Sequence, residues 1–260
     1  MIKNLSNIQP LMIFVFLGFF FTLESFVPYL THYKNRRRHT YRNLFLVLLT
    51  FLANGLVASW FTYWLSVIHL KGWGILNILN LTPVLSVILG VLLIDFDSYI
   101  GHILFHKIPV FWRIHRVHHS DNELDSTSSL RFHPFEVFIQ ALWRTLTFAF
   151  IGVSFESFVI FFTIAIPLLF IQHANIKFPD RPEKWLSHVF VTATWHRIHH
   201  SDEQEFTDSH YGNVFTFWDR IFGTFHRNVP IDSLRWGLKE LKDDRTQRVN
   251  YQLILPFKRE

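Results

Sequence analysis

The sequence predicts an all-α protein: a multi-pass membrane helical bundle with a cytosolic helical cap that carries clustered histidines. Half of the 260 residues (50%) are hydrophobic, and 30 of them are phenylalanine. Four apolar stretches are too long for a soluble domain of this size, and twelve of the sixteen histidines fall between His102 and His210. No repeat or linker divides the chain, so residues 1–260 are predicted to form one domain.

Three of the apolar stretches predict single membrane spans, near residues 11–33, 44–67 and 75–100. A spanning helix needs about 20 mostly apolar residues, and each stretch meets that length. The first lacks the basic leading region and the cleavage site of a signal peptide, so we expect a retained helix.

The fourth apolar stretch, residues 135–171, is too long for one straight span. It is interrupted near residues 152–156, which predicts either a helical hairpin or a pair of short spans. Both alternatives return the chain to the side that it left.

A basic cluster at residues 34–42 lies between the first two spans and predicts their orientation. Such clusters favour the cytoplasmic side of a membrane. Two further crossings then place His102 and the following residues at the cytoplasmic face. The predicted cytosolic cap comprises residues 107–134 and 178–260.

The net charge of +5 and the pI near 9.5 do not indicate nucleic-acid binding, because the basic residues flank apolar spans and no nucleic-acid motif lies among them. Anionic lipid headgroups are the better partner for this charge.

Eight histidines form three tight clusters, a pair and two His-x-x-His-His boxes. On a helix, residues three and four apart share a face, so the pair offers two imidazoles to one point and each box offers three. Because one tetrahedral ion takes about four ligands, two metal ions are the economical interpretation. The chain has no cysteine, which excludes thiolate-held clusters, and nitrogen ligands suit iron, copper or zinc. The clustered residues are His102, His106, His115, His118, His119, His196, His199 and His200.

The segments that hold these clusters resemble the fatty acid hydroxylase/sterol desaturase superfamily. Residues 95–136 read DFDSYIGHILFHKIPVFWRIHRVHHSDNELDSTSSLRFHPFE, and residues 172–225 contain QHANI, WHRIHHS and HYGNVFTFWDRIFGTF. The resemblance covers about half of the chain. It implies a membrane-embedded, non-haem di-iron enzyme that uses dioxygen and two electrons to oxidise a lipid. It also implies that the eight clustered histidines, with His173 of QHAN, are the metal ligands.

Two positions depart from the family pattern. Ile103 stands where the family commonly has arginine, and His210 stands where asparagine is usual. Neither departure touches a histidine of the clusters. His210 adds an imidazole near the site that we expect to support a ligand.

Two further residues are candidates to support the ligands. Asp95, near the end of the third span, is expected to accept a hydrogen bond from a ligand imidazole. The alternative is that Asp95 is simply a carboxylate at a helix end, and this alternative fits Asp97 better than Asp95. His133 is expected to support the site, with structural packing and direct metal ligation as the alternatives. His188 fits ordinary packing, and His32, His39, His69 and His226 fit interfacial or surface positions.

The residues after the third cluster predict local structure. Asp208, Tyr211, Gly212 and Asn213 are expected to form a turn that closes the cap over the metals. The segment from Trp218 to Thr224 is interpreted as a structural, aromatic helix stopped at Gly223. The alternative is that Asp219 or Arg220 braces a histidine-bearing helix.

The predicted function is dioxygen-dependent oxidation of a C–H bond in a membrane lipid, such as a fatty acyl chain or a sterol, by hydroxylation or desaturation at two iron ions. No segment resembles a cytochrome b5, a ferredoxin or a flavin reductase, so a separate donor of one of these types is expected. Lys177, Arg181 and Lys184 are candidates to attract it, although simple solvation explains them equally well.

Clustered histidines also occur in proteins with two other functions. A membrane metal-binding or metal-transport protein is the alternative, but its ligands would be expected within the spans. Haem ligation needs only two axial histidines and would leave six of the clustered ones unexplained.

Overall fold

The computed structural model describes residues 2–31, 35–227, 229 and 233–258. Within them the regular structure is helical, and the extended pairings are three isolated β-bridges. Three helical segments are long and apolar enough to cross a membrane, Arg36–Ile78, Pro83–Lys107 and Phe155–His173. The predicted all-α, multi-pass membrane fold is therefore confirmed.

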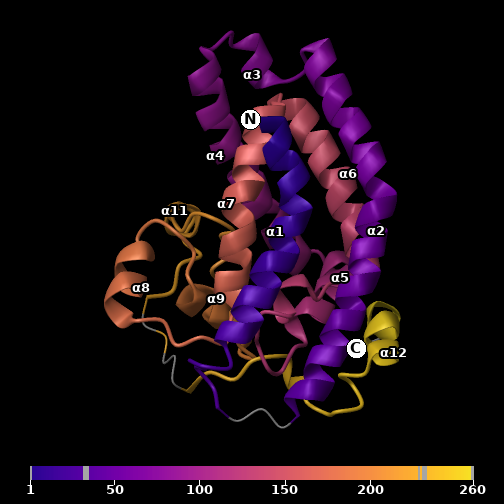
Figure 1. The fold of residues 1–260 in the computed structure, drawn as a ribbon, viewed down its shortest axis with the longest axis vertical. Coiled ribbons are helices and arrows are strands. Elements are labelled where there is room, and N and C mark those ends of the chain that lie inside the picture. Colours follow the sequence, from indigo (N-terminus) through magenta and orange to yellow (C-terminus); the bar gives the residue numbers. More distant parts are fainter. Residues whose placement is uncertain (1, 32–34, 228, 230–232, 259–260) are drawn as a thin grey trace.

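Five long helices form the bundle (Figure 1). Helices α1, α4 and α7 run toward the end that carries the clustered histidines, and α2 and α6 run away from it. The N-terminal end of α1 lies at the opposite end of the bundle. The five long helices are α1 Ile2–Leu23, α2 Arg36–Lys71, α4 Pro83–Lys107, α6 Pro134–Ile151 and α7 Phe155–His173.

Helix boundaries differ from the expected spans. Helix α1 ends at Leu23, because the buried carboxylate of Glu24 accepts hydrogen bonds from the backbone N–H groups of Ser126 and Asn175 at 2.7 and 3.0 Å. The expected span continued to residue 33, and residues 32–34, with part of the basic cluster, lie outside the described residues.

The second and third expected spans also change length. Helix α2 extends past both ends of residues 44–67 and includes the basic residues 36–42. The third stretch divides into the short α3, Ile75–Ile78, and α4, which begins at Pro83, a residue preorganised for the first helical position. Helix α4 continues to Lys107 and so carries the histidine pair.

The fourth apolar stretch is a helical hairpin. Helices α6 and α7, of 18 and 19 residues, are joined at residues 152–154, where an interruption was expected. At about 1.5 Å per residue each is nearly 30 Å long, and of the two α7 is one of the segments apolar enough to cross a membrane. Gly152 has a positive φ of 83°, and the backbone of Gly74 packs directly against it. The hairpin returns the chain to the histidine end.

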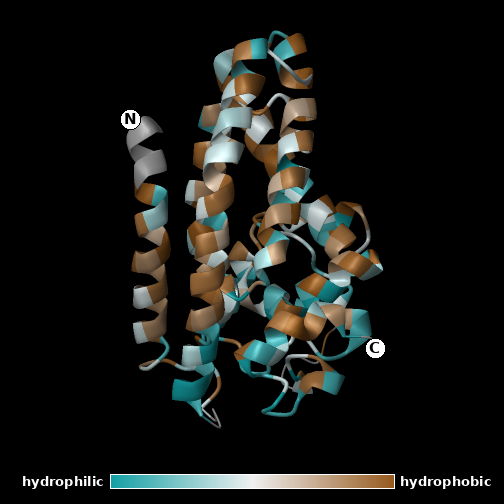
Figure 2. Ribbon diagram, turned by 90° about the vertical axis from the view of Figure 1, so that its right-hand side faces the viewer, coloured by the Kyte–Doolittle hydropathy of each residue, from teal (hydrophilic) through white to brown (hydrophobic). Residues whose placement is uncertain are grey.

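Short helices build the cap at that end (Figure 1). Figure 2 shows that hydrophilic residues gather toward the cap, whereas the long helices are mainly apolar between their ends. The cap elements are α5 Pro109–His119, η1 Ser128–Leu130, α8 Asp180–Leu186, α9 Ala193–His199, α10 Gln204–Thr207, α11 Phe217–Ile221, η3 Lys239–Leu241, α12 Val249–Ile254 and η4 Leu255–Phe257.

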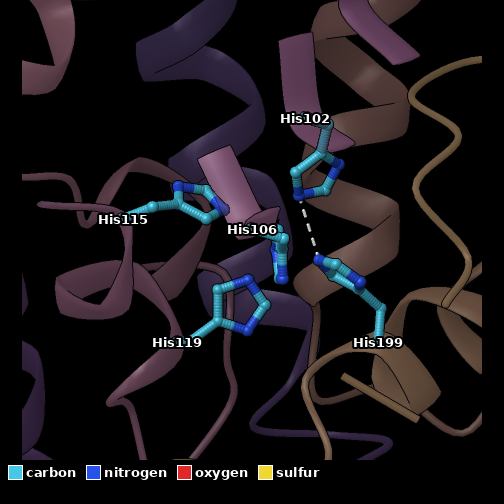
Figure 3. A group of neighbouring side chains, drawn as sticks. All are labelled: His102, His106, His115, His119 and His199. Carbon is cyan, nitrogen blue, oxygen red and sulfur yellow. Dashed lines mark hydrogen bonds between the residues drawn. The ribbon is translucent and has the colours of Figure 1, made fainter. Parts of the chain in front are cut away.

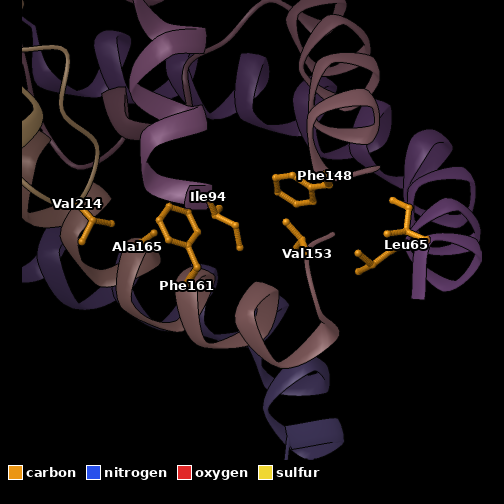
Figure 4. Close-up of a cluster of buried hydrophobic side chains, with 8 residues drawn as sticks. Leu65, Ile94, Phe148, Val153, Phe161, Ala165 and Val214 are labelled. Carbon is orange, nitrogen blue, oxygen red and sulfur yellow. The ribbon is translucent and has the colours of Figure 1, made fainter. Parts of the chain in front are cut away.

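A buried apolar cluster joins the bundle to the cap (Figure 4). Ile94 of α4, Phe148 of α6 and Phe161 of α7 pack there with Leu65 of α2. Val214, from the loop between α10 and α11, enters the same cluster. This packing fixes the loop that follows the third histidine cluster against the membrane helices.

Candidate metal centre

Four segments far apart in the sequence bring nine histidines together at one end of the bundle. Helix α4 carries the pair in its last turns, α5 carries the second cluster, α7 ends at His173, and α9 ends with the third cluster. Eight of the nine are buried and His102 is partly exposed.

The nine imidazoles form two groups. In each group, one ring nitrogen per residue lies within 4.8 Å of those of all the others. The first histidine group, drawn in Figure 3, is His102, His106, His115, His119 and His199. The second histidine group is His118, His173, His196 and His200.

This division corrects the expectation that each box offers three imidazoles to one point. Helix α5 gives His115 and His119 to the first group but His118 to the second. At the end of α9, His199 belongs to the first group, whereas the capping residue His200 belongs to the second. Adjacent residues on a helix point about 100° apart, so each box helix serves both groups.

Backbone carbonyls fix the tautomers in the first group. His102 Nδ1 lies 3.0 Å from the Tyr211 carbonyl, and His199 Nδ1 lies 2.7 Å from the Ser209 carbonyl. A carbonyl only accepts, so each Nδ1 donates and each Nε2 carries a lone pair. These two Nε2 atoms lie 3.0 Å apart (Figure 3). Two lone pairs at this distance repel each other unless a cation lies between them.

The second group repeats the pattern. His118 Nδ1 lies 3.3 Å from the Arg131 carbonyl and His173 Nδ1 lies 2.8 Å from the Leu169 carbonyl, while their Nε2 atoms are 3.3 Å apart. Two nitrogens each about 2.1 Å from one ion lie roughly 3 Å apart, so both spacings fit metal ligation.

Several buried ring nitrogens have no hydrogen-bond partner within the described structure. An unsatisfied buried polar atom is costly, and binding of a cation through one nitrogen of each imidazole removes part of this cost. The residues fit metal ions, and the all-nitrogen donor set is compatible with iron. These atoms are both ring nitrogens of His106 and His119, Nε2 of His115, and Nδ1 of His196 and His200.

Burial keeps the cap histidines neutral. It lowers the pKa of His118, His119, His196, His199 and His200 well below the usual range, and neighbouring imidazoles lower each pKa further. Neutral imidazole is the form that binds a metal ion.

Glu136, at the start of α6, is a site residue that the sequence analysis missed. Its Oε1 accepts a hydrogen bond from His115 Nδ1 at 2.9 Å, which directs His115 Nε2 into the first group. The sequence feature that indicates Glu136 is an acidic side chain at the start of an apolar stretch, where a charge is costly unless it has a function.

Two expected supporters make no hydrogen bond to the nine histidines. His133 caps α6, because its Nδ1 accepts from the Phe135 N–H at 3.2 Å and its Nε2 lies 3.2 Å from the Leu253 carbonyl. His210 stacks on Trp195 with ring centroids 5.2 Å apart. Its φ of 51° explains the asparagine usual at this position, since asparagine tolerates positive φ well.

Asp95 does not bind an imidazole either. Its carboxylate accepts from the backbone N–H groups of Val214 and Phe215 at 2.9 and 3.2 Å and from Trp218 Nε1 at 2.9 Å. These loop N–H groups need a buried acceptor. Asp95 supplies it and thereby ties the loop to α4.

Asp219 braces a ligand through the backbone. It accepts from the N–H groups of Tyr211 and Gly212 at 2.8 and 2.9 Å, and the Tyr211 carbonyl is the acceptor of His102. Burial raises the pKa of Asp219 to about 6. Arg220 instead donates to the carbonyls of Ser187 and His188.

His39 was expected at a surface or interface, but it lies in a buried polar network. Its Nε2 is 2.8 Å from Asp121 and its Nδ1 is 3.2 Å from Asp125. His69 is exposed, as expected, and His32 lies outside the described residues. His188, for which ordinary packing was expected, is exposed, and its Nδ1 lies 2.8 Å from the Lys184 carbonyl.

A cavity of about 220 Å³ lies beside both groups, between α4, α6 and α7. Imidazoles of both groups line it, including His102 and His115 of the first and His118, His173 and His196 of the second. A molecule in this cavity would contact both groups.

Comparison with known proteins agrees with this geometry. The fatty acid hydroxylase family model matches residues 87–224, which contain all nine histidines. The chain is 28% identical over 145 residues to ornithine lipid hydroxylase OlsE of Rhizobium tropici, covering 56% of this chain and 43% of that protein. It is 31% identical over 144 residues to alkylglycerol monooxygenase of Caenorhabditis elegans, covering 55% and 28%.

A third relative is cholesterol 25-hydroxylase of Homo sapiens, 26% identical over 143 residues, covering 54% of this chain and 51% of the relative. The matched segment thus spans about half or less of the length of these relatives. No solved structure matches the chain.

Proposed function

This chain belongs to the fatty acid hydroxylase family, and we propose that it hydroxylates a C–H bond of a membrane lipid, using dioxygen, two electrons and a di-iron centre. The observation that carries the proposal is the convergence of two imidazole groups beside a cavity inside a membrane helix bundle. The relatives are named as oxygenases of different lipids, which favours hydroxylation over desaturation and supports the lipid class without selecting one lipid.

In this proposal the first histidine group holds one ion and the second group holds the other. Two bound iron ions would supply the oxidising power that an unactivated C–H bond requires and that no acid or base of the chain supplies. The chain itself orients the imidazoles through backbone carbonyls and Glu136, keeps them neutral by burial, and surrounds them with protein.

The cavity walls would orient the lipid. Phe162, Ile166 and Leu169 of α7 give one apolar wall, which suits a hydrocarbon chain. The imidazoles at one end of the cavity place the reacting carbon next to both groups.

We further propose that the cap faces the cytoplasm and receives electrons from a separate donor protein there. The basic residues 36–42 lie at the same end of the bundle as the histidines, and such residues favour the cytoplasmic side. Lys177, Arg181 and Lys184 are exposed on the cap and suit an acidic donor.

The arrangement favours an enzyme over a metal conduit. The histidine groups lie at the ends of α4 and α7 and in the cap, whereas a transport path needs ligands along the spans.

Lipid profiling by mass spectrometry tests the proposal, using iron-replete cells that express the chain or its His199→Ala variant at equal level. We expect a lipid that gains one oxygen atom only with the wild-type chain. A lipid that loses two hydrogens instead would identify a desaturase. Identical lipid profiles in the two strains, with folded and metal-loaded protein, would contradict the proposal.

A further inference from the structure

Tyr211 lies against the first histidine group. Its ring centroid is 5.6, 5.1 and 5.7 Å from those of His102, His106 and His199. The side chain is only 1% exposed. Phenols and indoles are among the side chains that lose one electron most readily. An oxidisable ring is therefore in direct contact with three of the imidazoles that would hold a redox-active ion.

A path of aromatic rings leads from Tyr211 to the surface. Tyr99 of α4 is fully buried, and its ring lies 6.5 Å from that of Tyr211. Phe96, three residues earlier on α4, stacks on Tyr99 at 6.4 Å and contacts Trp218 at 4.7 Å. Trp218 of α11 is partly exposed. Three oxidisable side chains, Tyr211, Tyr99 and Trp218, therefore lie between the first histidine group and the surface of the cap.

Two of these side chains donate a hydrogen bond directly to a carboxylate. The Tyr211 hydroxyl donates to Asp208 Oδ1 at 3.1 Å, and the other oxygen of Asp208 pairs with Lys107 at 2.9 Å. Trp218 Nε1 donates to Asp95 Oδ2 at 2.9 Å. Both rings thus have an acceptor in place for the proton that an oxidised phenol or indole releases.

Tyr99 reaches a third carboxylate through Thr224. Thr224 Oγ1 donates to Asp219 Oδ1 at 2.6 Å. A hydroxyl has only one proton to donate, so the Tyr99 hydroxyl is the donor in its 3.0 Å hydrogen bond with Thr224. Each of the three oxidisable side chains is therefore paired with its own proton acceptor.

We propose that Tyr211, Tyr99 and Trp218 form a redox relay that carries oxidising equivalents away from the metal centre when no lipid occupies the cavity. This inference rests on the proposed function and adds a protective role to it. The bound iron supplies a strong oxidant after reaction with dioxygen. Without a lipid C–H bond in the cavity, the nearest oxidisable groups are the ligand imidazoles and Tyr211.

The first two steps move an electron toward the centre and keep each proton local. Tyr211 gives one electron to the oxidised iron and its hydroxyl proton to Asp208, which leaves a neutral tyrosyl radical. Tyr99 then gives one electron to this radical, and Tyr211 takes its proton back from Asp208. The proton of Tyr99 passes to Thr224 as Thr224 gives its own proton to Asp219.

The last steps bring the oxidising equivalent to the surface. Trp218 gives one electron to the Tyr99 radical and its indole proton to Asp95, while the proton of Tyr99 returns through Thr224. A soluble one-electron reductant such as ascorbate then supplies an electron to Trp218, and Asp95 returns the proton. The net result is one electron from the reductant delivered to the centre without damage to a ligand.

Rapid-freeze electron paramagnetic resonance tests the relay without measuring lipid turnover. Iron-loaded protein is reduced with a stoichiometric reductant, kept free of lipid substrate, mixed with dioxygen and frozen after increasing times. We expect the earliest radical in the wild-type protein to be a tyrosyl radical. Protein that carries ring-deuterated tyrosine identifies it, because deuterium narrows the signal of a tyrosyl radical and not that of a tryptophanyl radical.

Two conservative variants locate the radical. Tyr211→Phe keeps the ring but cannot form a phenoxyl radical, so we expect loss of most of the tyrosyl signal at wild-type iron content. In Tyr99→Phe the radical should form at Tyr211 and decay more slowly, because its next electron donor is missing. Tyr63→Phe is the matched control, since Tyr63 is exposed on α2, and it should keep the wild-type signal.

Iron that is oxidised by dioxygen in the wild-type protein without any tyrosyl radical would overturn the relay. A wild-type signal in iron-loaded Tyr211→Phe, or an unchanged decay in Tyr99→Phe, would also overturn it. The two proposals fail separately: a tyrosyl radical without any lipid oxidation would refute the enzymatic function, and lipid oxidation without the radical would refute the relay. Iron that does not react with dioxygen would overturn both.

Discussion

His118 and His119 are neighbours in the sequence, but their imidazoles belong to different histidine groups. His118→Ala and His119→Ala should therefore each lower the metal content by about one ion per chain, each from a different group, and each abolish lipid oxidation. Elemental analysis and product assays check this. His69→Ala is the control, because His69 is exposed and lies at the far end of α2. Wild-type metal content in both α5 variants would contradict the division into two groups.

Glu136 orients His115 through a single hydrogen bond, so its replacement should weaken metal binding without removing a ligand. We expect Glu136→Ala to lower metal affinity roughly 10–100-fold, and Glu136→Gln to have a smaller effect because its amide oxygen still accepts from Nδ1. Competition with a chelator measures the change. Glu205→Gln, at an exposed position, is the control. Unchanged affinity in Glu136→Ala would show that His115 needs no such partner.

The sequence predicted which histidines gather but not how their second nitrogens are held. The boxes are visible as spacing along the chain. Most of their hydrogen-bond acceptors are backbone carbonyls, such as those of Ser209 and Tyr211, and a carbonyl carries no side-chain signal. Asp95 was expected to bind an imidazole because its position is costly, yet its partners are backbone N–H groups of a loop. The cost of burying a carboxylate indicates that it has a hydrogen-bond partner, but it does not identify that partner.

At the scale of elements, the hairpin of α6 and α7 depends on a close backbone contact. A Cβ added at Gly74 would lie 2.1 Å from the backbone nitrogen of Gly152, and Gly74 has a φ of 99°. Gly74→Ala should therefore destabilise the protein and lower its thermal midpoint in detergent. Gly55→Ala is the matched control, since nothing lies within 4 Å of a Cβ added there and alanine favours a helix. Equal midpoints for the two variants would contradict this packing.

Hydropathy located the apolar stretches and the interruption in the fourth one, but it placed the helix ends poorly. Helix α2 continues into the cap because Arg42 pairs with Asp244 at 2.8 Å and Asn43 donates to Asp121 at 2.9 Å. Contacts with residues far along the chain set these ends, and a local sequence window does not contain those residues.

For the whole molecule, α1 and α4 both run toward the histidine end of the bundle (Figure 1). Thr31, which follows α1, and Glu205 of α10, in the cap, therefore lie at the histidine end, and Thr82, which precedes α4, lies at the other end. The chain has no native cysteine, so single cysteines at these exposed positions report the orientation. In intact cells, an impermeant thiol reagent should label the Thr82→Cys variant and not the other two. Labelling of both Thr31→Cys and Glu205→Cys, but not of Thr82→Cys, would invert the proposed orientation. Opposite results at positions 31 and 205 would contradict the fold.

The buried histidines should make the metal-free protein sensitive to acid. Their pKa lies well below the usual value of about 6.5, so the unfolded chain binds more protons than the folded chain once the pH falls below that value. Their contribution to stability is complete above about pH 6.5 and is lost as the pH falls further. Thermal unfolding as a function of pH should show this decline, with a shallower slope in His119→Gln. A flat profile from neutral to acidic pH would show that these imidazoles are accessible to protons.

The nine imidazoles are proposed to hold two metal ions, and the number of ions per chain tests this directly. The measurement is elemental analysis of folded, metal-replete protein by mass spectrometry, normalised to protein by amino-acid analysis. We expect about two transition-metal ions per chain, with iron in the active protein. One ion or fewer per chain would contradict a centre of two ions.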